Sequence, residues 1–339
     1  MNEKERLISA LRLEGVDRVP CACPLQTGTI DLMKITGAYW PDAHKDADLM
    51  TKLAIGAHDI AGIESVRVPF DVTVDASAFG AVTGKETIDR QPSIIQRPIK
   101  TPEDIDKIEI PDPYRNGRAP IVIEAVRKLS ERMKETPVIC AIISPFMLAG
   151  QLRGEQEAIM DIIKNPDFLK RVLEISARWG IEYSAAAIQA GADIIAMVDA
   201  TSSGTVLGPS QYAEFAMPYQ KMVADSIRKN GAYSILHICG NTTKNLKYMA
   251  QTGVNGISVD QQMDISWVKE QLKGKCATIG NVSPTSTLLK KSPADVEDEV
   301  RKCIEGGTDV VAPGCGFAPE TPLENMRALV NATKKYGKR

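Results

Sequence analysis

The second half of the chain repeats one pattern of apolar and polar positions. A stretch with helical periodicity ends at a glycine, and a short continuous apolar run follows that ends in a polar residue or a cysteine. The instances are Gly191 before 192–199, Gly231 before 232–239, Gly253 before 254–260 and Gly307 before 308–315. Glycine commonly ends helices, and a continuous apolar run is typical of a strand buried on both faces. The pattern predicts repeated helix–strand units.

Similar runs along the whole chain predict eight strands: 19–24, 65–71, 137–144, 192–199, 232–239, 254–260, 277–282 and 308–315. Helical patterns lie between most of them, among them 166–190, 210–229 and 294–305. Eight strands alternating with helices indicate an α/β fold, a single (β/α)8 barrel over residues 1–339 that begins with an N-terminal helical extension. The first half is less regular, since 72–120 contains mixed short elements and Pro111–Tyr114 has the composition of a surface loop.

The number of residues that separates each helix-ending glycine from the polar residue after it predicts the height of that polar residue in the barrel. Asp199, Cys239 and Cys315 each follow their glycine by eight residues, and Asp260 follows its glycine by seven. Strand residues rise about 3.3 Å each, so equal offsets predict equal heights at the C-terminal ends of the strands, where barrel enzymes carry their chemistry. We expect these four residues to gather at the barrel mouth.

Composition and charge narrow the classes of function. Hydrophobic residues make up 43% of the chain and the formal net charge is −2, which gives no basic excess for nucleic acid. No apolar run approaches the roughly 20 residues that span a bilayer, and the N-terminus has no signal-peptide core. We therefore expect a cytoplasmic protein without membrane insertion. An odd number of cysteines, seven, favours catalysis, metal binding or burial over a disulfide framework.

His237-Ile238-Cys239 carries two metal-ligand residue types at positions i and i+2. Alternate side chains of a strand point the same way, so both can reach one ion, and Cys315 supplies a third donor from a distant strand end. One histidine with two cysteinates suits Zn²⁺, and three protein ligands leave a position open, as in catalytic sites. The competing interpretation is a buried histidine beside a buried cysteine.

The other cysteines and histidines are better explained as structural residues than as metal ligands. Cys21 and Cys23 form a second pair on one strand, but no histidine lies near them in the sequence, and we expect inert burial. Burial is also the expectation for Cys140, Cys276 and Cys303. His44 and His58 show no partner pattern, and Asp59 beside His58 is interpreted as incidental.

The sequence resembles the uroporphyrinogen decarboxylase superfamily along nearly its whole length. The resemblance lies in the segments Arg6–Pro20, Gly280-Asn281-Val282 and Pro319–Met326. Within that superfamily, His237-x-Cys239 followed far downstream by Cys315 is similar to the zinc motif of the methylcobamide:coenzyme M methyltransferases of methanogenic archaea. The segment Val198–Gly204 resembles the same branch.

The resemblance implies a uroporphyrinogen decarboxylase-like (β/α)8 barrel that binds one Zn²⁺ per chain. It implies transfer of a methyl group from a methylated corrinoid, carried by a separate corrinoid protein of the methanol or methylamine pathway, to the thiol of coenzyme M in methanogenesis. Asp199 and Asp260 are interpreted as partners of His237 or proton acceptors, with strand-end capping as the alternative. Arg67 or helix N-termini are candidates for the sulfonate. The fourth zinc ligand is left open between water, Asp199 and Asp260.

Three alternatives are carried forward. The first is a metal-free decarboxylase, which characteristically has histidine where this chain has Cys315. Asp71 falls at the decarboxylases' essential aspartate, but their arginine-rich N-terminal motif is absent from Cys21–Gly28, so Asp71 is expected to be structural or to line the pocket. The second is methylation of another thiol such as homocysteine. The third is a non-catalytic module that only binds a corrinoid protein.

Overall fold

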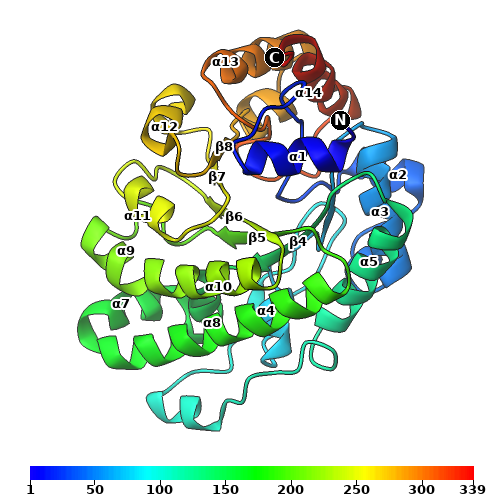
Figure 1. The fold of residues 1–339 in the computed structure, drawn as a ribbon. Helices are drawn as coiled ribbons and strands as arrows, with labels where there is room; N and C mark the ends of the chain where they lie inside the picture. The colour runs from blue at the N-terminus through cyan, green and yellow to red at the C-terminus, as the bar shows by residue number, and fades with distance from the viewer.

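Six strands form one parallel sheet in the order β1-β4-β5-β6-β7-β8 in a computed structural model that describes residues 1–339 (Figure 1). Their bounds are β1 Val66–Val68, β4 Val138–Ile143, β5 Ile194–Asp199, β6 Tyr233–Ile238, β7 Gly256–Val259 and β8 Ala277–Ile279. Every residue of β4 and β5 is buried. Such strands lie between helices and a packed interior, which explains their continuous apolar sequences.

The two remaining predicted strands, 19–24 and 308–315, close the sheet into a barrel through isolated parallel bridges. Val310 pairs with Ile279 of β8, and Val311 pairs with Cys21. The Glu64 backbone N–H, just before β1, donates to the Cys21 carbonyl at 2.8 Å. Both segments contain prolines, which have no N–H to donate to a ladder, so their pairing is interrupted and neither forms a continuous strand. The predicted (β/α)8 fold is confirmed.

Helices cover the outside of the barrel (Figure 1). They are α1 Glu3–Leu11, α2 Ile30–Thr36, α3 Ala47–Asp59, α4 Val74–Ala78, α5 Ala119–Arg132, α6 Pro145–Arg153, α7 Glu155–Lys164, α8 Pro166–Gln189, α9 Pro209–Phe215, α10 Met217–Lys229, α11 Leu246–Gln251, α12 Ile265–Leu272, α13 Pro293–Glu305 and α14 Leu323–Tyr336. The predicted helix 210–229 is divided into α9 and α10 at Ala216, because Pro218 suits only the first turn of a new helix.

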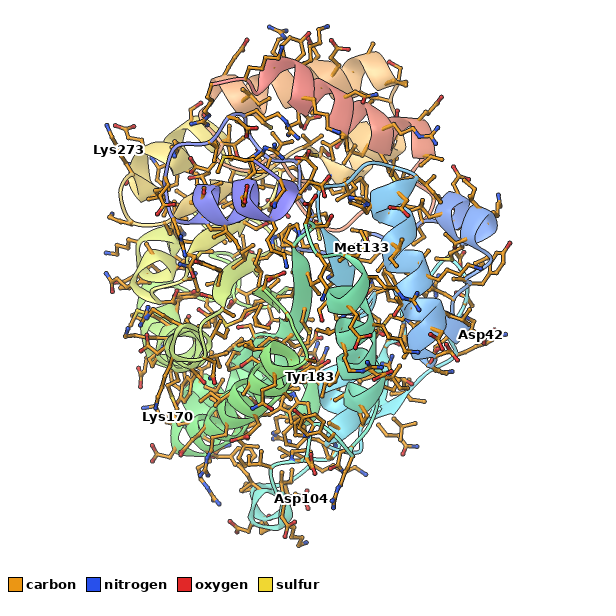
Figure 2. All side chains as sticks on the ribbon, turned by 45° about the vertical axis from the view of Figure 1, so that its right-hand side comes forward. Asp42, Asp104, Met133, Lys170, Tyr183 and Lys273 are labelled. Carbon is orange, nitrogen blue, oxygen red and sulfur yellow. The ribbon has the colours of Figure 1, made fainter.

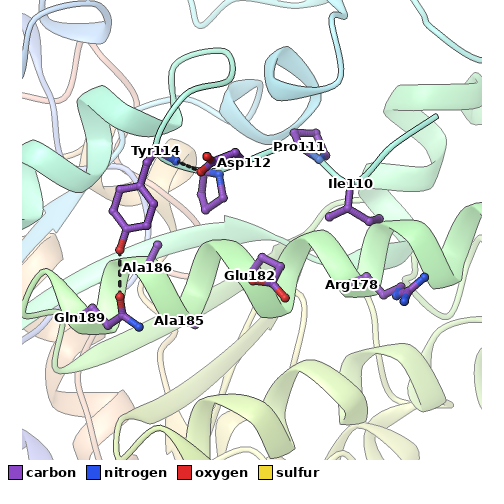
Figure 3. A pocket seen from close by; sticks show the side chains of 10 residues that line it. Ile110, Pro111, Asp112, Tyr114, Arg178, Glu182, Ala185, Ala186 and Gln189 are labelled. Carbon is purple, nitrogen blue, oxygen red and sulfur yellow. Dashed lines mark hydrogen bonds between the residues drawn. The ribbon is translucent and has the colours of Figure 1, made fainter.

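Short elements fill the segment 72–120, as the sequence predicted. They include α4 and an antiparallel pair, β2 Val82–Thr83 and β3 Ile94–Gln96. The loop that contains Pro111–Tyr114 crosses α8, where the Tyr114 hydroxyl donates to Gln189 Oε1 at 3.0 Å (Figure 3). A surface pocket of about 440 Å³ lies between this loop and α8. Tyr114 is 52% exposed, so the predicted surface loop is confirmed.

The N-terminal helix α1 covers the end of the barrel where the strands begin. Lys4 forms an ion pair with Asp193, just before β5, at 2.9 Å. Arg12 Nε donates to the hydroxyl of Tyr233, the first residue of β6, at 2.7 Å. We call this end the floor and the opposite end, where the strands finish, the mouth.

Side chains fill the space between the barrel and its helices (Figure 2). Tyr183 of α8 is completely buried, whereas Asp104, Lys170 and Lys273 lie toward the outline of the molecule in this view. No helix of the structure is both long enough and apolar enough to cross a membrane.

Candidate metal centre

The register of the sheet turns His237 toward the barrel interior. Partner residues on adjacent parallel strands point to the same face, and one such row runs from Val198 through His237 and Ser258 to Ile279. His237 is completely buried. Cys239 follows two residues later, where β6 has just ended, and its thiol is partly exposed. The i, i+2 spacing therefore delivers an imidazole and a thiol to one side of the wall.

Cys315 reaches the same place from the last strand segment because the chain is flanked by glycines. A Cβ atom on Gly314 would lie 2.6 Å from the backbone nitrogen of Gln261, and one on Gly316 would lie 2.9 Å from Gln26 Cβ. Neither position has room for a side chain. The glycines let the backbone pass closely between its neighbours, and Cys315 alone projects from this turn toward Cys239.

The three donor atoms have the spacing of a tetrahedral zinc site. The thiol sulfurs of Cys239 and Cys315 are 3.7 Å apart, and His237 Nε2 lies 3.2 Å from Cys239 Sγ. All three donors lie within 4.8 Å of one another. Tetrahedral zinc with Zn–S about 2.3 Å and Zn–N about 2.05 Å separates two sulfurs by about 3.8 Å and nitrogen from sulfur by about 3.6 Å. The residues present thus fit one zinc ion.

Ser258 fixes which ring nitrogen of His237 is free. His237 Nδ1 lies 3.2 Å from the Ser258 carbonyl oxygen and 3.1 Å from its hydroxyl. A carbonyl only accepts, so Nδ1 carries the proton and Nε2 presents its lone pair to the other donors. Metal-binding histidines are usually held by such a contact.

The two thiols of the site affect one another's protonation. A hydrogen bond from Cys239 lowers the pKa of Cys315, with a further contribution from His237. The same hydrogen bond raises the pKa of Cys239, to which burial also contributes. One thiolate therefore forms readily in this pair, and the second thiol keeps its proton until a cation replaces it.

The remaining cysteines are buried away from this centre, as expected. Burial raises the pKa of Cys23 and Cys140 to about 12 and that of Cys303 to about 11. Cys21 and Cys276 are also buried, with pKa values raised for the same reason. None of these five thiols belongs to the three-residue metal cluster.

Asp199 lies at the end of β5 but on the other face of the wall from His237. It pairs in register with Ile238, the neighbour of His237. Its Oδ1 accepts hydrogen bonds from the backbone N–H groups of Thr201 and Ser202, and Gln220 of α10 is 3.4 Å from its Oδ2. Burial raises the pKa of Asp199. These contacts are those of a strand-end cap, and an acid–base role stays a prediction.

Asp260 also caps its strand end. Its Oδ2 accepts a hydrogen bond from the Gly240 N–H at 2.9 Å, directly after Cys239, and its Oδ1 accepts one from the Gln262 N–H at 2.9 Å. Neither aspartate contacts His237, whose partner is Ser258. One signal for Ser258 was present in the sequence and overlooked: it is a polar residue in the middle of a buried strand.

Asp71 is fully engaged by neighbouring side chains. Arg118 donates to both of its oxygens, at 2.7 Å and 2.9 Å, and the Thr73 hydroxyl donates to Oδ1 at 2.7 Å. Burial would raise the pKa of Asp71, but Arg118 outweighs it and holds the pKa well below its usual range. These contacts are typical of a structural aspartate and not of one that is free to bind substrate.

Comparison with known proteins agrees with the fold. The sequence model of the family described as uroporphyrinogen decarboxylase (URO-D) matches residues 2–336. The chain is 40% identical to methylcobamide:CoM methyltransferase MtbA of Methanosarcina mazei and 36% identical to methylcobamide:CoM methyltransferase MtaA of Methanosarcina barkeri, over 98% of each chain. A solved methyltransferase from Methanosarcina mazei superposes with a TM-score of 0.95 at 36% identity, covering 99% of both chains. The chain therefore belongs to the uroporphyrinogen decarboxylase (URO-D) family, and within it to the methylcobamide:CoM methyltransferases.

Proposed function

We propose that this protein transfers a methyl group from a methylated corrinoid to the thiol of coenzyme M, using one zinc ion held by His237, Cys239 and Cys315. The observation that carries the proposal is the convergence of these three donors within 4.8 Å at the barrel mouth. Relatives named methylcobamide:CoM methyltransferase match over 98% of the chain, which supports the same reaction here. We further propose that residues 1–339 act as a single catalytic domain.

Zinc, when bound, would hold the thiol of coenzyme M as a thiolate near neutral pH, where a free thiol with pKa about 8.5 is mostly protonated. The donor set determines how nucleophilic that thiolate stays. Two cysteinates and a neutral His237 cancel the charge of the ion, so the substrate sulfur keeps much of its electron density. Additional histidines in place of cysteines would leave positive charge at the site and weaken the nucleophile.

Methyl transfer then requires no further cofactor. The thiolate sulfur attacks the methyl carbon in line with the carbon–cobalt bond, a sulfur–carbon bond forms, and the electron pair of the broken bond stays on cobalt. The products are methyl-coenzyme M and cob(I)amide. The thiol proton leaves earlier, and Asp260 is the better placed of the two proposed acceptors because it bonds Gly240 beside Cys239, whereas Asp199 lies on the other face.

The methyl donor is proposed to be carried by a separate corrinoid protein that docks over the mouth. A corrinoid ring is far larger than the space between three side chains, so it must approach from outside the barrel. The partly exposed thiols of Cys239 and Cys315 are compatible with such an approach.

The test combines metal analysis with a methyl-transfer assay. We expect about one zinc per chain and loss of methylcobalamin absorbance that depends on coenzyme M. Chelation should abolish the reaction and added zinc should restore it. Homocysteine is the competing acceptor. If coenzyme M consumes no methylcobalamin while homocysteine does, the proposed acceptor is wrong; if the metal-free protein is fully active, the zinc site is wrong.

A further inference from the structure

Arg67 of β1 is an arginine inside the barrel. It pairs in register with Ile139, which pairs with Ile194, and Ile194 pairs with Tyr233. Tyr233 and His237 are four residues apart on one strand, so they share a face. By this register Arg67 projects from the wall on the same interior face as His237.

The guanidinium of Arg67 is buried without an anion. The residue is 2% exposed, its Nη1 donates to the Pro69 carbonyl, and its Nε has no hydrogen-bond partner. No carboxylate lies within ion-pair distance of it, although 27 such pairs occur in the molecule. Burial lowers the pKa of Arg67 to about 10, which still leaves it charged at neutral pH. A buried charge without a partner is costly, so the site lacks a negative group.

The carboxylate that raises the pKa of Arg67, that of Asp71, is already paired with another arginine. Asp71 contributes to the surroundings of Arg67, but both of its oxygens accept from Arg118. Asp71 is therefore committed to Arg118, and Arg67 keeps an excess positive charge that has no ion-pair partner.

Cys23 connects this charge to the metal centre. Burial dominates the raised pKa of Cys23, yet Arg67 lowers that pKa and Cys315 raises it further. The Cys23 backbone N–H donates to the Ser65 hydroxyl at 3.2 Å, two residues before Arg67, and the turn after Cys23 packs at Gln26 against Gly316, the neighbour of Cys315. The excess cation therefore lies on the Cys315 side of the barrel and faces the same interior.

We infer that Arg67 binds the sulfonate of coenzyme M, so that the substrate enters with its anionic end toward the barrel interior and its thiol toward the mouth. The inference rests on the proposed function and adds the determinant of substrate choice. Coenzyme M is short, with an ethylene bridge between sulfonate and thiol, so a single cation suffices for its tail. The Arg67 side chain extends toward the mouth end of β1, where its Nη1 donates to the Pro69 carbonyl. This orientation leaves the sulfur facing the corrinoid.

The experiment compares two thiols that differ in charge. 2-Mercaptoethanol has the same length as coenzyme M but a hydroxyl in place of the sulfonate. In Arg67→Met, we expect the ratio of kcat/KM for coenzyme M to that for 2-mercaptoethanol to fall roughly 10- to 100-fold, the value of a hydrogen-bonded charge pair. Arg67→Lys should recover part of the ratio, and Arg6→Met, the loss of a buried arginine that pairs with Asp17 at the floor, should leave the ratio unchanged.

An equal fall with both thiols, or no fall, would overturn the assignment. Zinc content and thermal unfolding establish that each variant is folded. If Arg67→Met does not fold, the readout is calorimetric binding of ethanesulfonate, which lacks a thiol, to wild-type protein and Arg67→Lys; absence of binding to wild type rejects the subsite. Ethanesulfonate binding also separates the two proposals, because it tests the anion subsite even if neither thiol is methylated.

Discussion

The two ends of the barrel satisfy their polar groups differently. At the floor, charged side chains are paired with one another: Glu64 binds Arg18 and also accepts from the Cys21 N–H, and His58 bridges Glu3 and Asp59. At the mouth, the donors of Cys239 and Cys315 are partly exposed and have only each other and His237 as partners. Paired groups stabilise a fold, whereas donors that converge without a counter-charge are available for a ligand. The floor should therefore control stability and the mouth activity.

The largest effect is expected at the mouth, from Cys315→Ala. Outer-shell partners of a metal are typically worth 10- to 100-fold, so loss of a ligand should reduce coenzyme M methylation on the order of 10³-fold or more and remove stoichiometric zinc. Metal analysis and the methylcobalamin assay measure both. Cys276→Ala, a buried cysteine next to the start of β8 and outside the cluster, is the matched control and should keep zinc.

If the mouth controls activity and the floor controls stability, Cys315→Ala should also leave the fold intact. Chelated wild type and chelated Cys315→Ala should unfold at similar temperatures. A large difference between them would mean that the thiol contributes to packing, and the contrast between mouth and floor would fail.

The next largest effect is expected at the floor, from Glu64→Ala. Removal of this buried carboxylate leaves Arg18 and the Cys21 N–H without their partner, which should cost about 3–5 kcal/mol of unfolding free energy. Urea unfolding measures the loss, and kcat of the folded fraction should stay near that of wild type. If activity falls as strongly as in Cys315→Ala, the two ends are not separable.

The sequence predicted the barrel and the metal ligands because both depend on local patterns. Helix-ending glycines and continuous apolar runs mark the strands, and a strand spacing of two residues brings His237 and Cys239 to one face. The same offsets predicted that Asp199 lies level with Cys239, but the sheet pairs Asp199 with Ile238. Height does not determine face, however, and a shift of one residue turned Asp199 toward Gln220 instead of the interior.

Such local patterns do not predict which side chains pair when their residues lie far apart in the chain. Arg118 is 47 residues from Asp71, and Thr136 is 133 residues from Glu3. The interpretation of Asp59 beside His58 as incidental was wrong, because His58 hydrogen bonds Asp59 at 2.7 Å and Glu3 of α1 at 2.9 Å. A pairing between helices far apart in the chain appears only when the floor is assembled.

A smaller effect at the mouth is expected from Ser258→Ala. The Ser258 carbonyl would still accept from His237 Nδ1, so only the hydroxyl contact is lost. Zinc affinity should fall roughly tenfold, the low end of the range for outer-shell partners. Competition with a chelator measures it. Ser234→Ala, near the floor on β6, should leave zinc affinity unchanged; an equal effect of both serines would remove Ser258 from the description of the site.

The smallest effect is expected at the floor, from the titration of His58. Its hydrogen bond to Glu3, together with Asp59, raises the pKa of His58 to about 9 in the folded chain, against about 6.5 when unfolded. Because the folded pKa is the higher one, the stabilisation is fully present below pH 6.5 and disappears as the pH rises through 9. Asp59 is largely exposed, so we expect only about 1 kcal/mol after solvent screening.

Urea unfolding of wild type and of His58→Gln between pH 6 and pH 10 measures how much the charge of His58 contributes to the free energy of unfolding. Wild type should be the more stable at pH 6, and the difference should shrink toward zero near pH 10. A constant difference would mean that packing rather than charge is lost. Methyl transfer by the folded His58→Gln variant should equal that of wild type at every pH, because the charge that titrates lies at the floor, across the barrel from the thiols that hold the metal.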